Sequence, residues 1–141
     1  MISKIENVLE RVLDADIGKL ILRVSIAVLL LLHGLKKLTT GIDGIKYLVK
    51  SASLPEVLAY GVYVGEVISP IFLILGLYTR FFSLIFASTM AFAIFLAHSN
   101  SLFTLSAKSG GLLIELPLLY LISALSLIFL GAGKYSVDYR K

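Results

Sequence analysis

One acidic residue, Glu66, lies inside an apolar stretch that is long enough to cross a lipid bilayer. The stretch covers residues 60–80 and reads YGVYVGEVISPIFLILGLYTR. A carboxylate in hydrocarbon costs free energy, so ionisable residues within membrane spans are rare and commonly functional. No helix cap explains an acid in mid-span, and a purely structural ion pair is the main alternative to a role in proton transfer or ligand binding. Glu66 is therefore the first candidate for chemistry.

Two basic side chains near the end of an earlier apolar stretch are the candidate partners of Glu66. His33 and Lys37 are four residues apart and share one helical face. At 1.5 Å per residue, Glu66 lies ~12 Å and His33 ~8 Å below the same membrane surface. Helical Cα–Cβ bonds tilt toward the helix N-terminus, so in antiparallel spans these side chains converge. We predict that Glu66, His33 and Lys37 form a proton relay or contact a quinone.

Three further ionisable residues are secondary candidates. Arg23 lies in the opposite half of the membrane and leans away from Glu66, so we expect it to snorkel to the headgroups or to form a buried pair. His98, at a span end, is expected at the interface, and Glu115 lies in a first helical turn, where the helix dipole favours a carboxylate. His33, His98, Glu66 and Glu115 are ligand types that suit zinc or iron, but no local spacing supports a metal site, and none is predicted.

The composition indicates an integral membrane protein with a single domain, residues 1–141. Of 141 residues, 58% are hydrophobic and 16% charged, and the mean hydropathy is +0.96, which is far more apolar than a soluble domain. The net charge of +4 comes from basic residues scattered between apolar runs, so it does not indicate nucleic acid. The absence of cysteine excludes disulfides, thiolate metal sites and thiol–disulfide chemistry, including that of the disulfide-forming quinone reductases.

The periodicity predicts an all-α membrane protein, a four-helix antiparallel bundle. The apolar runs that form its spans are residues 17–38, 58–77, 81–97 and 112–130. The very short turn at residues 78–80 makes the second and third spans antiparallel neighbours. Two amphipathic helices are predicted at residues 2–13 and 42–51. The first either lies on the membrane surface or packs on the end of the bundle.

Basic residues set the expected orientation in the cell (inner) membrane. With four spans, both termini and the turn near Arg80 lie on one side, which holds eight lysines and arginines, and the other side holds five. The positive-inside rule then places both termini in the cytoplasm. The first sixteen residues contain no apolar run, so no cleavable signal peptide is expected.

Short local patterns predict three further features. Gly61, Gly65 and Ser69 recur every four residues, and such a small-residue face lets another helix approach, within the bundle or across a homo-oligomer. Asp14 and Asp16 are candidate N-caps for the first span. Residues 53–56 (SLPE) read as a capping box, which assigns Glu56 to capping.

Several short motifs, taken in order, resemble those of the DoxX family of small four-span membrane proteins from bacteria and archaea. They are Arg23, Gly34 with Lys37, Glu66, residues 76–80 (GLYTR) and residues 131–138 (GAGKYSVD). The resemblance covers about residues 17–138. It implies a plasma-membrane location, a four-helix bundle and involvement in quinone-linked redox chemistry or in a complex that supports redox homeostasis. A relative of the family, DoxD, is a subunit of a thiosulfate:quinone oxidoreductase. The motif positions carried over are Arg23, Lys37, Glu66 and Arg80.

Three functions compete on this evidence. The first is a quinone-interacting subunit of a membrane oxidoreductase, in which Glu66, His33 and Lys37 serve the quinone. Such a subunit would have no redox cofactor of its own and would receive electrons from a protein partner. The second is a small proton-coupled transporter that uses Glu66, and the third is a structural or assembly subunit with Glu66 locked in an ion pair. The substrate, the electron donor and the oligomeric state are not specified by the sequence.

Overall fold

The computed structural model describes residues 1–140, and within them the fold is all helical, as predicted. An isolated bridge between Leu105 and Leu112 is the one extended pairing in the described chain. The helices in chain order are α1 (Ile2–Val12), α2 (Ala15–Thr40), α3 (Asp43–Ser51), a 3₁₀-helix (Glu56–Tyr60), α4 (Gly61–Tyr63), a π-helical turn (Val64–Ile68), α5 (Ser69–Leu75), α6 (Thr79–His98), α7 (Glu115–Leu130) and a final 3₁₀ turn (Asp138–Arg140).

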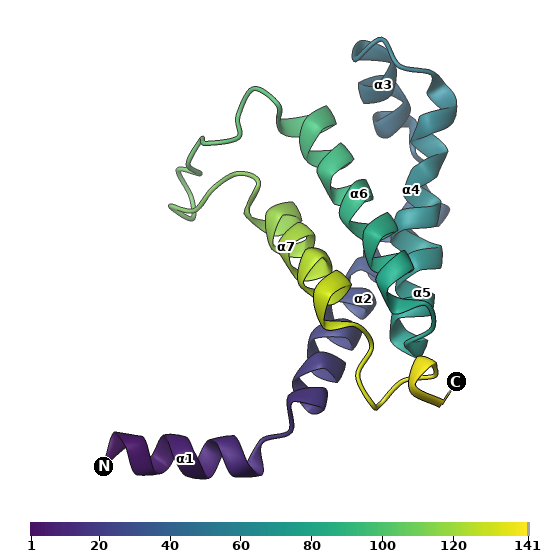
Figure 1. Cartoon of the computed structure of the whole chain (residues 1–141). Coiled ribbons are helices and arrows are strands. Elements are labelled where there is room, and N and C mark those ends of the chain that lie inside the picture. Colours follow the sequence, from purple (N-terminus) through teal and green to yellow (C-terminus); the bar gives the residue numbers. More distant parts are fainter. Residues whose placement is uncertain (141) are drawn as a thin grey trace.

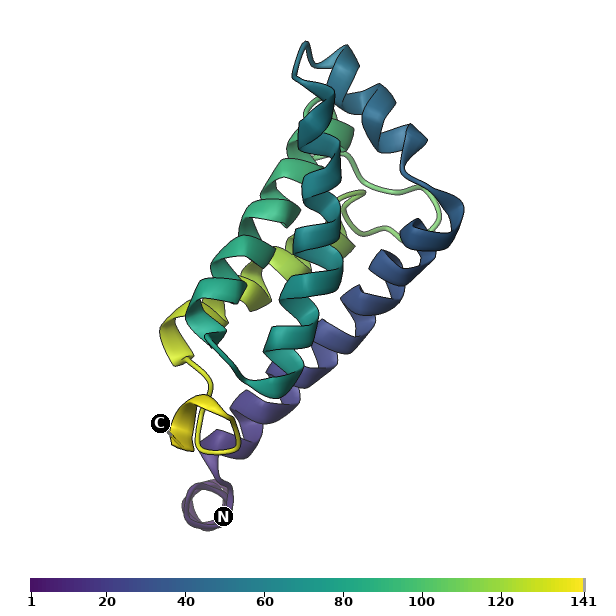
Figure 2. The same ribbon diagram turned by 90° about the vertical axis from the view of Figure 1, so that its right-hand side faces the viewer.

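Four helical segments lie side by side and enclose the main core. The segment that runs from the 3₁₀-helix through α5 packs between α2 and α6, and α7 packs along α6 (Figures 1 and 2). Apolar side chains of all four meet in the centre, where Ala27, Leu73, Phe86 and Leu127 are buried. A second, smaller apolar cluster joins α3 to the 3₁₀-helix and α6 through Ile42, Val49, Ala59 and Val62.

Two segments are long and apolar enough to cross a membrane. These are Glu56–Leu75 and Thr79–His98, with 20 residues each. They correspond to the predicted second and third spans. The predicted first span lies within α2, and the fourth corresponds to α7, whose 16 residues reach only ~24 Å against a hydrocarbon core of ~30 Å. The structure thus identifies two candidate spans, and the count of four stays a prediction.

Both ends of the described chain lie at one end of the bundle. Figure 1 places α1, the turn between α5 and α6, and the C-terminal segment at that end, and Figure 2 places α3 and the loop before α7 toward the other. This arrangement matches the grouping used to count basic residues, although Lys141, one of the eight, lies outside the described residues. Which end faces the cytoplasm stays a prediction.

A reporter fused after Lys141 tests this orientation. We expect a reporter that folds only in the cytoplasm to be active there, because the end that carries both termini also carries the excess of lysine and arginine. The measurement is the ratio of cytoplasmic to periplasmic reporter activity for matched fusions. Activity of a periplasmic reporter at this position would mean that the span count or the orientation is wrong.

Helix α1 stands away from the bundle and lies across its axis (Figures 1 and 2). None of its residues is buried, and Ile5, Val8 and Leu9 of its apolar face are exposed. The alternative in which this helix packs on the end of the bundle is therefore wrong. Placement of the apolar face in the membrane surface stays a prediction.

Of the two predicted N-cap candidates, Asp14 caps the start of α2, and Asp16 lies within the first turn of the helix. The Asp14 carboxylate accepts a hydrogen bond from the Asp16 N–H at 2.9 Å and forms an ion pair with Lys134. The hydrogen bond with Lys134 is the main cause that lowers the pKa of Asp14 below its ordinary value of 3.8, and the pKa of Lys134 is raised above 10.5 by the same contact. The pair thus stabilises the fold above pH 3.8 and below pH 10.5. That contribution is lost as the pH falls through the lowered value or rises through the raised one.

The predicted capping box at residues 53–56 is wrong. Ser53 adopts a positive φ of 58°, and no side chain caps the 3₁₀-helix that follows. Glu56 instead pairs with Lys50 at 2.6 Å and with Lys46 at 3.6 Å. Its role is to tie α3 to the start of the next helical segment.

Candidate functional site

The side chains of Lys37 and Glu66 form a close ion pair between α2 and the π-helical turn. Lys37 Nζ donates to Glu66 Oε1 at 2.5 Å and to Oε2 at 2.6 Å. The Glu66 side chain is 6% exposed and that of Lys37 is 30% exposed. The prediction that Glu66 lies inside the bundle within reach of His33 or Lys37 is confirmed, and the partner is Lys37.

The backbone around Glu66 departs from the regular α-helix. Pro70, four residues later, has no N–H to donate to the Glu66 carbonyl, and its ring would crowd that carbonyl in an α-helix. The chain widens into a π-helical turn at Val64–Ile68, and the Ser69 hydroxyl donates to the Val64 carbonyl at 3.0 Å. Single π turns inside helices frequently occur at functional sites. This turn sets the position of the Glu66 side chain.

Gly34 allows α2 to touch the π-helical turn. A Cβ at this position would lie 2.3 Å from the Glu66 carbonyl oxygen, a distance that real Cβ atoms do not reach. Any larger residue would push the two backbones apart. Because Lys37 follows one turn later on the same face, this close approach brings its ammonium to the Glu66 carboxylate.

A cavity of about 690 Å³ adjoins the ion pair. Its walls come from the end of α2, from α3, from the segment that runs from the 3₁₀-helix through the π-helical turn, and from residues 84–97 of α6. Lys37 and Glu66 are the charged residues among its described lining, which is otherwise mostly apolar and includes Phe92. Two hydroxyls also line it, but Ser88 and Thr89 donate to carbonyls of their own helix at 2.9 Å. The cavity thus has a mostly apolar lining with one polar group, the Lys37–Glu66 ion pair, and this is the usual composition of a small-molecule site.

His33 does not join the pair. Its side chain is exposed, and its ring meets the edge of Tyr120 in α7 at 6.5 Å between centroids. Tyr120 is buried, packs against Phe86 and lies within electrostatic range of Glu66. The sequence analysis missed Tyr120, and the available signal was a phenol inside the apolar run of the fourth predicted span.

His98 and Glu115 lie apart from the cavity. His98 ends α6 and is partly exposed, and Glu115 begins α7 and is exposed, close to Gly111. Both positions match the interfacial and helix-dipole interpretations. Within residues 1–140, no three of the side chains that bind metals gather at one place, so the structure does not bring His33, Glu66, His98 and Glu115 together.

Arg23 is completely buried, so the snorkelling alternative is wrong. Its guanidinium donates to the carbonyls of Leu73, Ile74 (3.0 Å) and Tyr135 (2.8 Å). The partners are thus backbone carbonyls at the end of α5 and in the C-terminal segment. As expected, Arg23 is not a partner of Glu66.

The three small residues of the second span do not share one environment. A Cβ on Gly65 would lie 1.9 Å from the Thr89 hydroxyl of α6, and Ser69 is buried. Gly61 is exposed, and a Cβ there would meet no atom within 4 Å. The close approach predicted for this face therefore occurs within the chain at Gly65, and a homo-oligomer through all three residues stays a prediction.

A comparison with known protein families identifies the family of this chain. A family model described as DoxX matches residues 18–99, which is more than half of the chain. The chain belongs to the DoxX family. An uncharacterized protein of Haemophilus influenzae is 35% identical over 126 residues, covering 83% of this chain and 85% of that protein. A Bacillus subtilis protein named "Putative oxidoreductase CatD" is 29% identical over 123 residues, covering 87% of this chain and 86% of that protein. No solved structure matches the chain.

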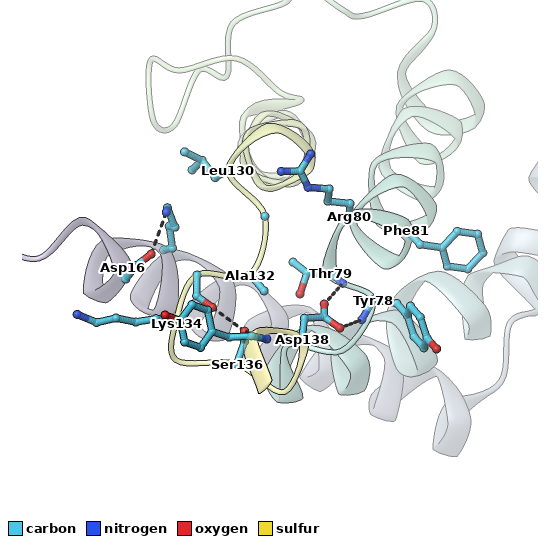
Figure 3. Close-up of a pocket in the computed structure, with 14 residues that line it drawn as sticks. Asp16, Tyr78, Thr79, Arg80, Phe81, Leu130, Ala132, Lys134, Ser136 and Asp138 are labelled. Atoms are coloured by element: carbon cyan, nitrogen blue, oxygen red, sulfur yellow. Dashed lines mark hydrogen bonds and ion pairs between the residues drawn. The ribbon is translucent and has the colours of Figure 1, made fainter. Parts of the chain in front are cut away.

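This DoxX protein is a membrane protein, and its motif residues gather at two places. Gly34, Lys37 and Glu66 meet beside the apolar cavity. The others meet at the end of the bundle that carries the termini, where Arg23 binds the end of α5. There the Asp138 carboxylate accepts hydrogen bonds from the N–H groups at the start of α6 (Figure 3). The residues that carry the resemblance thus divide into a candidate site and a structural junction, and those at 131–138 lie outside the segment that the family model matches.

Proposed function

We propose that this DoxX protein is a quinone-interacting subunit of a membrane oxidoreductase, with the quinone held in the cavity beside Lys37 and Glu66. The observation that carries the proposal is an ion pair with a buried carboxylate at the wall of an otherwise mostly apolar cavity. The printed name of the Bacillus subtilis relative, which covers most of the chain, supports the oxidoreductase class.

The residues present fit a quinone head. A volume of about 690 Å³ falls within the range of ~300–1,000 Å³ that is usual for small-molecule sites. Gly61, Ala93 and Ala97 leave space, and Phe92 offers an aromatic face for a flat ring. A quinone also needs hydrogen-bond donors for its carbonyl oxygens, and Lys37 supplies one at the cavity wall.

We assign different roles to the two residues of the ion pair: Lys37 donates a hydrogen bond to the ligand, and Glu66 exchanges a proton. An ammonium has three donors, and Lys37 directs two of them at Glu66, so one is left for a ligand carbonyl. Glu66 orients Lys37 and can hold or release a proton at a carboxylate oxygen. A bound quinone would supply the redox chemistry. With no cysteine in the chain, we propose that electrons come from a protein partner.

Filling the cavity tests this proposal. Gly61 lines the cavity in an ordinary helical conformation (φ −56°), and a Cβ there meets nothing within 4 Å. We expect Gly61→Leu to fold normally, because a helical glycine replaced by a larger residue gains backbone stability. Its affinity for a short-chain ubiquinone or menaquinone analogue should fall roughly tenfold or more, measured by calorimetric titration of protein in nanodiscs.

One control variant makes the binding result specific. Glu115→Gln removes an exposed carboxylate outside the cavity and should bind the analogues like the wild type. Gly65→Leu is a separate test of packing. It should fail to fold or assemble, because the leucine side chain would clash with the Thr89 side chain. If neither analogue binds the wild type, and proteoliposomes instead take up a solute in response to a pH gradient, the transporter alternative replaces the quinone proposal.

A further inference from the structure

A second cavity lies at the end of the bundle that carries both termini. Its volume is about 710 Å³, and it is bordered by the start of α2, the turn into α6 and the segment after α7 (Figure 3). Two glycines of that segment, Gly131 and Gly133, have positive φ values of 72° and 75°. A Cβ on Gly131 would lie 3.3 Å from Arg80 Nε, so the glycine lets the chain pass close to the guanidinium.

Arg80 is a cation of this cavity that forms no salt bridge in the described chain. Asp16 is paired with Lys19 at 2.9 Å, Lys134 is paired with Asp14, and the Asp138 carboxylate accepts the N–H groups that begin α6. Within residues 1–140, Arg80 forms no ion pair with an acid. Figure 3 places its side chain beside the end of α7, where the helix dipole offers only a partial negative charge.

Thr79 supplies a second, independent polar group. It is 1% exposed, it lines the cavity, and its hydroxyl has no hydrogen-bond partner in the described chain. A buried hydroxyl without a partner costs free energy, and such groups normally bind a ligand or water. Thr79 is the first residue of α6, and its backbone N–H already donates to the Asp138 carboxylate, so the hydroxyl and not the backbone is the group that Thr79 can offer a ligand.

We propose that this cavity binds the phosphodiester of a membrane phospholipid of net charge −1, with Arg80 and Thr79 as its ligands. The Arg80 guanidinium carries one positive charge, and its planar fork fits two phosphate oxygens. The exposed tyrosines of the cavity lining, Tyr78 and Tyr139, are typical of the headgroup level of a membrane protein. Basic pockets between membrane helices are known to hold anionic headgroups. The proposal does not depend on the quinone site.

Native mass spectrometry of the full chain, purified in mild detergent and depleted of lipid, tests the proposal. Phosphatidylglycerol and phosphatidylcholine are titrated in parallel, and we expect one phosphatidylglycerol per chain to bind in preference. Arg80→Met should weaken that binding roughly tenfold or more, because a charge-assisted hydrogen bond is lost. The affinity of Arg80→Lys for phosphatidylglycerol should lie between those of the wild type and Arg80→Met, since lysine keeps the positive charge but lacks the planar guanidinium donors.

Thr79→Val tests the same site independently of Arg80, and it can be measured even if Arg80→Met does not fold. The hydroxyl it removes has no partner within the described protein, so the fold should be unaffected while phosphatidylglycerol binding falls several-fold. Arg11→Met, a change on exposed α1 at the same end of the bundle, should bind like the wild type. Three results would each overturn a specific phospholipid site. The first is unchanged binding in both Arg80→Met and Thr79→Val, and the second is an equal loss of binding in Arg11→Met. The third is displacement of the lipid by millimolar inorganic phosphate.

Discussion

Replacing Lys37 by methionine is expected to lower the free energy of unfolding by about 3–5 kcal/mol, because it leaves the Glu66 carboxylate buried without its partner. The Glu66 side chain is 6% exposed and both of its oxygens accept from Lys37. Methionine matches the length and the apolar stem of lysine, so the change removes the charge and little packing. The measurement is thermal or denaturant unfolding of the purified protein in detergent.

A double-mutant cycle separates the loss of the pair from the loss of either residue. Glu66→Gln alone leaves a partly buried ammonium with a weaker partner, so it should also destabilise the protein. Glu66→Gln combined with Lys37→Met removes both charges, and stability should recover most of the loss. If the effects of the two single changes simply add, the residues do not act as a pair and the ion-pair interpretation is wrong.

The same variants distinguish a structural anchor from a functional pair. If Lys37 and Glu66 serve a quinone, the double variant should regain stability yet still bind a quinone analogue weakly, because neither the donor nor the titratable group has returned. If the pair is only structural, stability and binding should recover together. A Glu66→Gln protein that is normal in both measurements would remove Glu66 from the mechanism.

Replacing Arg23 by methionine is expected to cost more than about 3 kcal/mol, because three carbonyls at the junction lose a charged donor in the interior. Arg23 is fully buried and links α5 to the C-terminal segment through Leu73, Ile74 and Tyr135. Arg23→Lys should rescue little, since one ammonium cannot span the carbonyls that the guanidinium fork reaches. Unfolding should be accompanied by faster tryptic cleavage after Lys134, because the segment is no longer held.

Lys19 is the matched control for Arg23. It lies one turn earlier in α2, is partly exposed and pairs locally with Asp16 at 2.9 Å. Because an exposed pair of this kind contributes ~0–1 kcal/mol, Lys19→Met should change stability little and leave the tryptic pattern intact. Equal effects of the two changes would mean that the junction depends on the basic charge of this end and not on the contacts of Arg23.

Several parts of the site could be predicted because they depend on properties that act within one helix. The 3.6-residue period placed the amphipathic helices at residues 2–13 and 42–51 close to where α1 and α3 lie. The tilt of the Cα–Cβ bond indicated that Lys37 and Glu66 converge, and the ion pair confirms it. Asp14 was predicted as a cap because an N-cap depends only on its own turn.

Other parts could not be predicted because they depend on how helices meet. Gly61 and Gly65 recur at a helical interval, but the chain there passes from a 3₁₀-helix into a π turn, so a spacing of four residues no longer defines one face. As a result Gly61 lines the cavity while Gly65 contacts Thr89. The signal for the π turn, Pro70 four residues after Glu66, was present in the sequence but was not used.

The sequence by itself determined the helical class, the membrane setting and two candidate partners for Glu66, His33 and Lys37, since apolar length, helical period and the cost of a charge in hydrocarbon are local or compositional properties. The structure selected Lys37. Only the tertiary structure decided what Arg23 does, because its partners lie about 50 and 112 positions away along the chain. The tertiary structure also decided that the His33 ring contacts the Tyr120 ring and that Arg80 and Thr79 line the same cavity. Contacts of this kind depend on the rotation and separation of packed helices, which no single helix specifies.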